Sequence, residues 1–159
     1  MLVTPTLTFR RIDPDADAMR AYAAYVDACR ASFGSDATAS HFEAHARWLR
    51  SRVEEFPDGH VLAWLGNRCV GQLELQVPYG RTTGYVNLFW VDPALRGLGW
   101  GRKLHDYAER YFRSWEATRV ELDVSPDNRR AVGFYRHLGY RFVHIAGETA
   151  RLWRMAKQL

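Results

Sequence analysis

The hydrophobic and polar positions at the start of this chain predict a strand followed by a helix. Residues 6–12 alternate apolar and polar side chains, which is typical of a half-buried strand. Asp13 and Pro14 come next, and they favour a helix start because Asp caps helices and Pro suits the first helical position. We therefore expect a helix that runs to about Ala31 and stops at Gly34.

The same pattern then predicts a second helix and a β-hairpin. Ser40 can cap the helix, which should end at residues 57–59, a Pro-Asp-Gly turn. Residues 60–65 and 68–77 are rich in strand formers, and the Gly-Asn pair that joins them favours a tight hairpin. Two helices should therefore precede the main sheet.

The second half of the chain predicts a central strand and the clearest helix of the sequence. Residues 85–91 are nearly all apolar, as expected for a strand that is covered on both faces. Between residues 104 and 115 the apolar side chains share one helical face, and polar side chains, including His105, lie opposite. We also expect a strand at 120–124, a short helix at 128–138 and closing strands at 140–145 and 150–155.

Length and composition are those of one compact domain that covers residues 1–159. The 159 residues, 47% of them hydrophobic, can bury one core but not two. The net charge of +4 is compatible with an anionic partner, but the basic residues are scattered, so we expect no nucleic-acid partner. Residues 1–8 lack a signal-peptide pattern, and no apolar run is long enough to span a membrane. We expect a cytoplasmic protein with no membrane partner.

A glycine-rich stretch before the clearest helix predicts an anion site. The stretch reads Arg96-Gly97-Leu98-Gly99-Trp100-Gly101. Backbone N–H groups at a helix N-terminus favour phosphate, and the cations Arg102 and Lys103 are unfavourable there unless an anion compensates them. The dinucleotide and Walker patterns are excluded, because both need Gly where Arg102 stands. Taken alone, the glycines are equally compatible with a simple tight turn.

Two motifs in this half of the chain resemble the GNAT superfamily of acetyl-CoA-dependent N-acyltransferases. Arg96, Gly99 and Gly101 match the family's loop, which begins with Gln or Arg and has Gly three and five positions later. Residues 128–140 look like the family's downstream motif, and the two motifs together cover residues 85–142. The resemblance implies the GNAT fold: an α/β (α+β) domain whose central mixed, mostly antiparallel sheet of six to seven strands is flanked by about four helices.

The resemblance also implies how acetyl-CoA is bound as a co-substrate. The glycine loop would hold the pyrophosphate, backbone N–H groups of the preceding strand would face the reacting carbonyl, and the downstream motif would contact the pantetheine arm and the thiolate. The expected acetyl-CoA-binding residues are Phe89, Trp90, Val91, Arg96, Gly97, Leu98, Gly99, Trp100, Gly101, Arg102, Asn128 and Tyr135. Asn128 can cap its helix as well. Tyr135 matches the family's usual general acid, and a core aromatic is the alternative interpretation.

Acetyl transfer to an amine also needs a base, because an alkylammonium with a pKa of about 10.4 is protonated at neutral pH. Asp123 is the first candidate, since it lies five residues before Asn128 and resembles a catalytic Glu of members that acetylate protein N-termini. Glu74, on a strand beside the expected central strand, is the second. Each carboxylate is otherwise a solvated or ion-paired strand residue.

The sequence contains no convincing metal or covalent-catalysis motif. His41 and His45 are one helical turn apart, but the HExxH order is absent, so we expect a solvated helix face and no metal. Cys29 and Cys69 lack a metal-type or redox-type spacing and are expected to be ordinary thiols. No activated Ser or Cys is evident, which favours direct transfer in a ternary complex.

The motifs predict an N-acetyltransferase that acts on a small amine or on a protein N-terminus or lysine. A noncatalytic module that binds or senses acyl-CoA is the alternative, and nucleic-acid binding ranks last. The aromatic residues available for an acceptor pocket are Phe33, Trp48, Trp64 and Tyr79, each of which is otherwise a core residue. The aromatic late strands offer a surface for a homodimer, and the sequence leaves the oligomeric state open.

Overall fold

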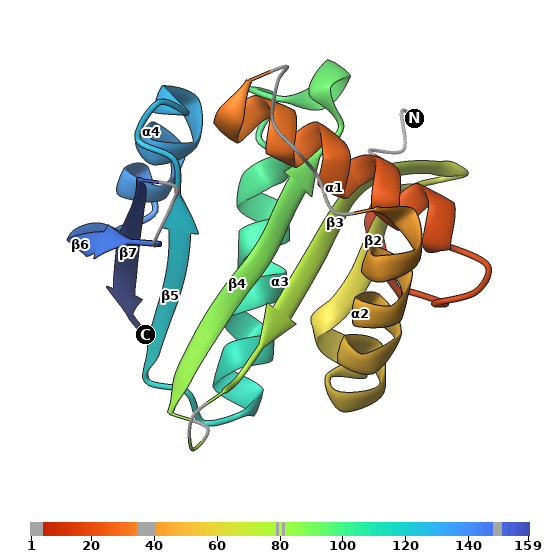
Figure 1. The fold of residues 1–159 in the computed structure, drawn as a ribbon, viewed down its shortest axis with the longest axis horizontal. Helices are drawn as coiled ribbons and strands as arrows, with labels where there is room; N and C mark the ends of the chain where they lie inside the picture. The colour runs from red at the N-terminus through yellow and green to blue at the C-terminus, as the bar shows by residue number, and fades with distance from the viewer. Residues whose placement is uncertain (1–4, 35–40, 79, 81, 148–150) are drawn as a thin grey trace.

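The computed structural model describes residues 5–34, 41–78, 80, 82–147 and 151–159, and its elements follow the expected order (Figure 1). The first half contributes β1 (Leu7–Arg11), α1 (Ala18–Phe33), α2 (Phe42–Glu55), the 3-10 turn η1 (Pro57–Gly59), β2 (His60–Leu65) and β3 (Arg68–Gln76). The second half contributes β4 (Thr83–Val91), the 3-10 turn η2 (Pro93–Leu95), α3 (Trp100–Ser114), β5 (Arg119–Val124), α4 (Arg129–His137), β6 (Arg141–Ala146) and β7 (Leu152–Gln158).

In the described part of the chain, seven strands form one sheet in the order β1-β2-β3-β4-β5-β7-β6. Only β4 and β5 run parallel to each other, and every other neighbouring pair is antiparallel. Four α-helices in the described ranges flank this sheet. The expected mixed, mostly antiparallel sheet with about four helices is confirmed.

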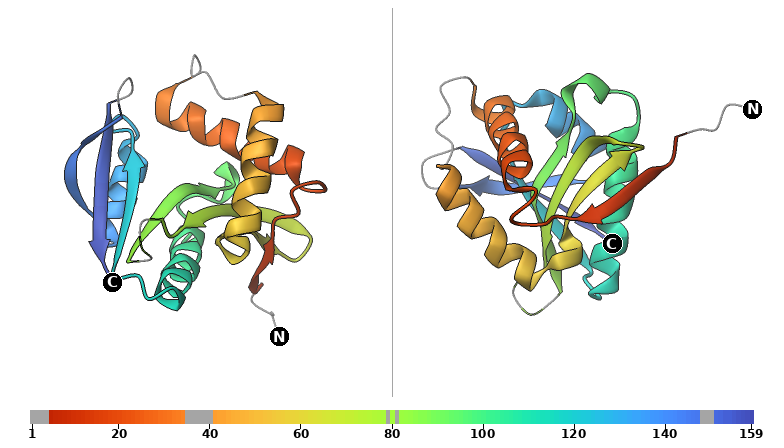
Figure 2. Two further views of the ribbon diagram at one scale, coloured as in Figure 1. Left: turned by 60° about the horizontal axis from the view of Figure 1, so that its bottom comes forward. Right: turned by 90° about the vertical axis from the view of Figure 1, so that its right-hand side faces the viewer.

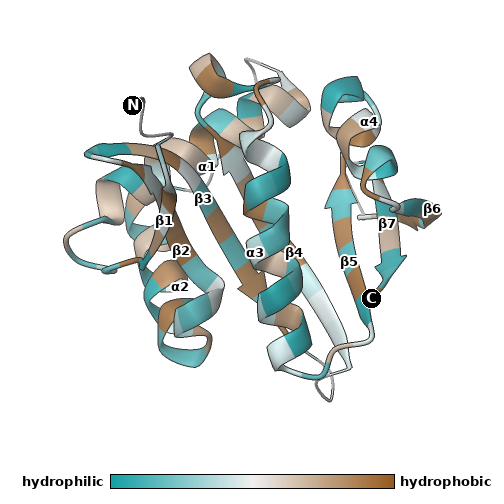
Figure 3. Ribbon diagram, turned by 180° about the vertical axis from the view of Figure 1, so that it is seen from behind, coloured by the Kyte–Doolittle hydropathy of each residue, from teal (hydrophilic) through white to brown (hydrophobic). Residues whose placement is uncertain are grey.

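The helices divide between the two faces of the sheet. α1 and α2 lie over β2, β3 and β4 on one face, and α3 and α4 lie on the other (Figures 1 and 2). The larger core is packed against α3 and α4, and includes Leu73, Leu104, Phe112, Leu122 and Met155. The smaller core lies under α1 and α2 and comprises Ile12, Ala21, Leu49 and Leu62. Polar residues cover the side of α3 that faces away from the sheet (Figure 3).

Most of the local predictions are confirmed. The hairpin of β2 and β3 closes with the pair Leu65↔Arg68 around Gly66, whose φ of 57° lies in the left-handed region. β4, β5, α4 and β6 lie within two residues of their expected bounds, and β7 continues to Gln158, three residues further than expected. No described helix is long and apolar enough to cross a membrane.

The predicted start of the first helix is wrong. Residues 14–17 form turns, and α1 begins only at Ala18. The Asp13 carboxylate does accept the N–H groups of Asp15 and Ala16 at 2.9 and 3.0 Å, as a cap would, but this contact closes the turn that precedes α1. The predicted cap of the second helix, Ser40, lies outside the described residues.

Two burial predictions are also wrong. β4 is not covered on both faces, since Asn87 is exposed between buried neighbours. His105, expected on the polar face of α3, is buried, and its Nε2 lies 2.9 Å from the Tyr140 hydroxyl. Tyr140 lies between α4 and β6, so the segment that covers His105 follows it by 35 residues, and periodicity along α3 alone carries no sign of it.

Candidate functional site

β4 and β5 pair side by side and then separate. Their ladder runs from Thr83↔Arg119 to Val86↔Leu122, whereas β4 itself continues to Val91 in pairing with β3. The β3–β4 register shifts just past the end of this ladder, which leaves Asn87 as an extra, bulged residue of β4. A bulge bends the strand that contains it. We call the region beyond Val86 and Leu122, where β4 and β5 diverge, the fork.

The backbone of β4 directs alternate N–H groups toward the fork. The Asp92 N–H donates to the Val70 carbonyl of β3 at 2.9 Å, and backbone groups change side at each residue of a strand. The Trp90 N–H therefore faces β3, whereas those of Phe89 and Val91 face the fork. Of the three donors expected from the sequence, Phe89 and Val91 are in position, and Trp90 is not.

The glycine loop joins the end of β4 to α3. Gly97 and Gly99 have φ values of 79° and 89°, in the left-handed region that glycine adopts without strain. Gly99 directly precedes α3, so the first N–H groups of that helix open into the loop. Gly101 serves packing instead, because a Cβ there would lie 3.1 Å from the Phe134 ring of α4. The loop thus combines a tight turn with an anion-binding helix terminus.

The cations around this loop differ in what they contact. Arg96 turns away from it, with Nη2 2.8 Å from the Asp27 carboxylate of α1 and Nε donating to the Val91 carbonyl at 2.9 Å. Arg102 is exposed at the start of α3. Arg130 was not expected from the sequence, yet its Nη2 lies 3.3 Å from where a Cβ on Gly97 would stand. The start of α4 comes to the loop only through the fold. In the sequence, the pair Arg129-Arg130 was the signal that could have indicated an anion-binding residue there.

α4 carries the two residues of the downstream motif to the fork. The Asn128 side chain accepts the Ala131 N–H at 3.2 Å, which confirms the predicted cap. The Tyr135 ring packs edge-on against Phe89, with 6.2 Å between ring centroids. Tyr135 is only 8% exposed, and burial raises its pKa, so the hydroxyl keeps its proton at neutral pH. Among the described residues, none forms a hydrogen bond with that hydroxyl.

Glu74 is a buried carboxyl beside the bulge of β4, on the sheet face toward α1. It is 1% exposed, and its two oxygens accept the Gln72 Nε2 at 2.9 Å and the Asn87 Nδ2 at 3.2 Å. Burial raises the pKa of Glu74 from 4.5 to about 7, although the two hydrogen bonds lower it in part. Because Asn87 is exposed, this carboxyl is one side chain away from solvent. A group of this kind can take up and release protons near neutral pH.

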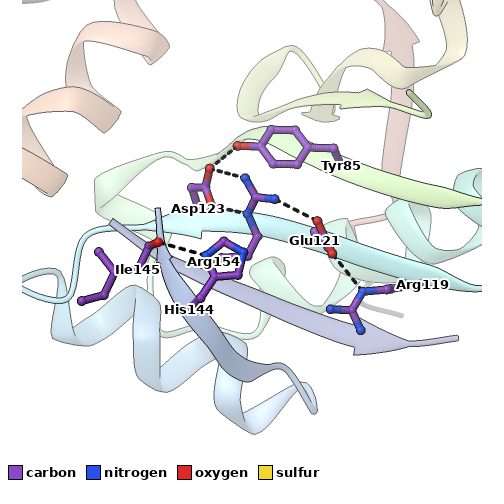
Figure 4. A network of polar contacts seen from close by, with 7 residues as sticks. All are labelled: Tyr85, Arg119, Glu121, Asp123, His144, Ile145 and Arg154. Carbon is purple, nitrogen blue, oxygen red and sulfur yellow. Dashed lines mark hydrogen bonds and ion pairs between the residues drawn. The ribbon is translucent and has the colours of Figure 1, made fainter. Parts of the chain in front are cut away.

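Asp123 has a different environment, which Figure 4 shows. Arg154 of β7 contacts both of its oxygens, with Nη2 2.9 Å from Oδ2, and the Tyr85 hydroxyl donates to Oδ2 at 3.0 Å. Arg154 also donates to Glu121 at 2.9 Å, and Glu121 accepts from Arg119 at 2.9 Å. Of the two interpretations left open for Asp123, the structure contains the ion pair.

The expected solvated face of α2 is wrong for His45. This side chain is buried and stacks on Tyr25 with 4.7 Å between ring centroids, and burial lowers its pKa. His41 precedes the helix. Groups of three or more His, Cys, Asp or Glu side chains arranged to hold a metal ion do not occur in the described ranges.

The candidate acceptor-pocket aromatics do not converge on the fork. Trp48 and Trp64 pack against the smaller core, and the Trp64 ring also lies 5.2 Å from the Arg10 and Arg20 guanidinium groups. Phe33 is 49% exposed at the end of α1. Tyr79 lies outside the described residues.

Comparison with known proteins gives matches along most of this chain. The sequence model of the acetyltransferase (GNAT) family matches residues 20–140. A mycothiol acetyltransferase of Beutenbergia cavernae is 35% identical over 104 residues, which is 65% of this chain and 31% of that protein. The chain therefore spans about a third of the length of this curated relative.

Solved structures share the fold over nearly the whole chain. The PaiA N-acetyltransferase of Thermoplasma acidophilum, in complex with coenzyme A, has a TM-score of 0.77 at 15% identity and covers 97% of this chain and 99% of its own. The spermidine N-acetyltransferase of Vibrio cholerae, in complex with coenzyme A and spermine, has a TM-score of 0.74 at 16% identity, with 96% and 95% covered. At these identities the likeness is one of fold.

Proposed function

We propose, because this chain belongs to the acetyltransferase (GNAT) family, that it moves an acetyl group from acetyl-CoA to a primary amine by direct transfer in a ternary complex. The acceptor is a small molecule or a protein N-terminus or lysine. The fork supports this proposal best, because it brings the free N–H side of Phe89 and Val91 together with Tyr135 and the glycine loop.

The residues around the fork fit acetyl-CoA. Gly97 and Gly99 adopt left-handed backbone conformations at the N-terminus of α3, where a pyrophosphate would accept backbone N–H groups, and Arg102 and Arg130 add positive charge. Bound acetyl-CoA supplies the acetyl group as a thioester. The Phe89 and Val91 N–H groups would stabilise the negative charge that develops on the thioester oxygen during transfer.

Glu74 is our choice for the base. Its raised pKa suits a group that takes the proton of the acceptor ammonium, directly or through a water, and returns it to solvent past Asn87. Asp123 is less suited, because Arg154 and Tyr85 already occupy its oxygens.

Tyr135 is our choice for the acid. Its hydroxyl is protonated at neutral pH and lies beside the strand that would hold the thioester, so it would donate a proton to the departing thiolate of coenzyme A. Asn128 caps α4 through its carbonyl oxygen, which leaves the amide Nδ2 to contact the pantetheine arm.

An acceptor screen tests this function. The chain is incubated with acetyl-CoA and a panel that includes spermidine, free amino acids, and peptides with a free N-terminus or lysine, and released thiol is measured. We expect one amine class to release thiol. Coenzyme A binding without turnover on any amine would favour the noncatalytic acyl-CoA module instead, and absence of both binding and turnover would refute both functions.

Two variants of neighbouring tyrosines sharpen the screen. Tyr135→Phe should retain coenzyme A affinity and lose turnover by about 10²-fold or more, because the proton donor is gone. Tyr140→Phe is the matched control, since Tyr140 packs against Tyr135 but its hydroxyl contacts His105, so turnover should stay within about twofold. Equal losses in both variants would indicate that Tyr135 acts through packing alone.

A further inference from the structure

The side chains at the point where β4 and β5 part are joined across the two strands. We propose that Tyr85, Asp123 and Arg154 form a clamp that fixes the opening of the fork and so positions its backbone donors relative to Tyr135. The inference rests on the proposed function, because its consequence is the geometry with which acetyl-CoA is held. It gives Asp123 a positioning role in place of the proton transfer first expected of it.

The clamp lies at the last position where the two strands can be tied together. Tyr85 is opposite Glu121 in the ladder, and the ladder ends one pair later at Val86↔Leu122. Asp123 is the first residue of β5 beyond that end. The bond from the Tyr85 hydroxyl to Asp123 Oδ2, at 3.0 Å, therefore reaches one step past the ladder, to the base of the fork.

Arg154 holds Asp123 in place from the neighbouring strand. Asp123 and Arg154 are directly paired in the β5–β7 register, and the guanidinium group contacts both carboxylate oxygens. A two-point contact between planar ions restricts orientation more than a single bond does. The Asp123 and Arg154 side chains are only 17% and 25% exposed, so solvent screens this pair less than a surface pair. Tyr85 thus bonds to a fixed acceptor.

The opposite face of the sheet holds the fork in another way. Asp123 alternates with Leu122 and Val124, which belong to the larger core, so the clamp lies on the face away from α3 and α4. On the α4 side the rings of Phe89 and Tyr135 are in contact. One branch of the fork carries Phe89 and the other leads into α4 and Tyr135, so the clamp and this ring contact jointly set the distance between N–H donor and acid.

Coenzyme A binding and steady-state kinetics of three variants test the clamp. Tyr85→Phe removes the hydroxyl that crosses the fork, and Asp123→Asn removes the charge that Arg154 holds. In calorimetry each variant should bind coenzyme A about three- to tenfold more weakly, since each loses one hydrogen bond across the fork. The double variant should bind coenzyme A as tightly as the single variant that binds it less well, because the two residues act through one contact.

Glu121→Gln is the matched control. Glu121 bonds to the same Arg154 but lies within the ladder, opposite Tyr85, so its loss should lower the melting temperature and leave coenzyme A affinity unchanged. A general loss of sheet stability would instead weaken coenzyme A binding in Tyr85→Phe, Asp123→Asn and Glu121→Gln alike. The clamp also predicts that Asp123→Asn keeps the wild-type pH profile of kcat, since no proton passes through this side chain.

Two results would overturn the clamp while the proposed function stands. The first is a loss of turnover in Asp123→Asn with unchanged coenzyme A affinity and an altered pH profile, which would make Asp123 the base. The second is unchanged affinity in Tyr85→Phe, Asp123→Asn and the double variant. A wild-type chain that binds no coenzyme A would refute the proposed function and the clamp together.

Discussion

Replacing Glu74 by Gln separates the chemistry of this side chain from its structural role. The substitution keeps the shape and removes the titrating proton. Gln72 Oε1 has no hydrogen-bond partner in the described part of the chain, so the Gln72 amide can turn and accept from the amide introduced at position 74. The buried contacts of residue 74 should therefore survive, although the turned amide gives up the 3.5 Å contact from Gln72 Nε2 to the Ala21 carbonyl. That loss does not titrate, so the change of the stability difference with pH should report the carboxyl.

The magnitude follows from the pKa of Glu74. A folded-state pKa of about 7, against 4.5 for the exposed group, corresponds to about 3 kcal/mol at about 1.4 kcal/mol per pH unit. Between pH 4.5 and 7 the folded state binds more protons than the unfolded state, so this carboxyl lowers wild-type stability as the pH rises. Above pH 7 the whole cost of about 3 kcal/mol is present. Glu74→Gln removes it.

Urea unfolding and turnover, both measured from pH 4 to pH 8.5, check these expectations. Relative to wild type, Glu74→Gln should gain stability between pH 4.5 and 7, and at pH 8 it should be more stable by up to about 3 kcal/mol. Its turnover should fall by about 10²- to 10⁴-fold. The buried histidines are common to both proteins, so their titration cancels in the difference.

Glu54→Gln on the exposed face of α2 is the control, because it makes the same chemical change without burial. It should alter neither stability nor turnover at any pH. The reasoning fails if the stability difference between Glu74→Gln and wild type does not change with pH, because the pKa of Glu74 would then be the same in the folded and unfolded states. It also fails if Glu74→Gln keeps wild-type turnover.

Three further predictions follow from other sites. His60 and His105 are buried, and burial lowers the pKa of each from 6.5 to about 4. The free energy of unfolding should therefore fall by about 3 kcal/mol per site as the pH drops from 6.5 to 4. His105→Gln should make this fall less steep in acid unfolding. Gly99→Ala should lower the free energy of unfolding in urea by about 1 kcal/mol, because alanine is strained at a φ of 89°. It should also weaken coenzyme A binding. Arg130→Gln should weaken coenzyme A binding in low salt and much less in about 0.5 M NaCl, because salt at that concentration already screens the exposed charge of Arg130. Weakening that does not depend on salt would refute a phosphate contact.

The parts of the fold set by neighbouring residues were predictable from the sequence. The turn at Gly66 depends on a conformation that Gly adopts at no steric cost, and the cap at Asn128 depends on an N–H three residues away. The glycine loop is of the same kind, since its turn and helix start are contained in six residues. Local chemistry decides such features, so a pattern of residues is enough to find them.

The fork was not predictable in the same way. It requires the bulge at Asn87, and that bulge exists only in the register between β3 and β4, which no single segment determines. Arg130 and the burial of His105 share this origin, because each depends on where α4 and β6 come to lie. Contacts between segments far apart in the sequence decide these features, and residue spacing carries no measure of them.

The two candidate bases show most clearly why distant contacts matter for function. Asp123 and Glu74 are both strand carboxylates, and spacing ranked Asp123 first. In the fold, Arg154, 31 positions further along the chain, pairs with Asp123 and occupies both of its oxygens. Among the described residues, Glu74 accepts hydrogen bonds from the neutral amides of Gln72 and Asn87 and has no cation as a hydrogen-bond partner, and burial raises its pKa to about 7. Since the partner decides whether a carboxylate stays charged or exchanges a proton near neutral pH, an Arg brought beside Glu74 should abolish its ability to act as a base without altering the residue itself.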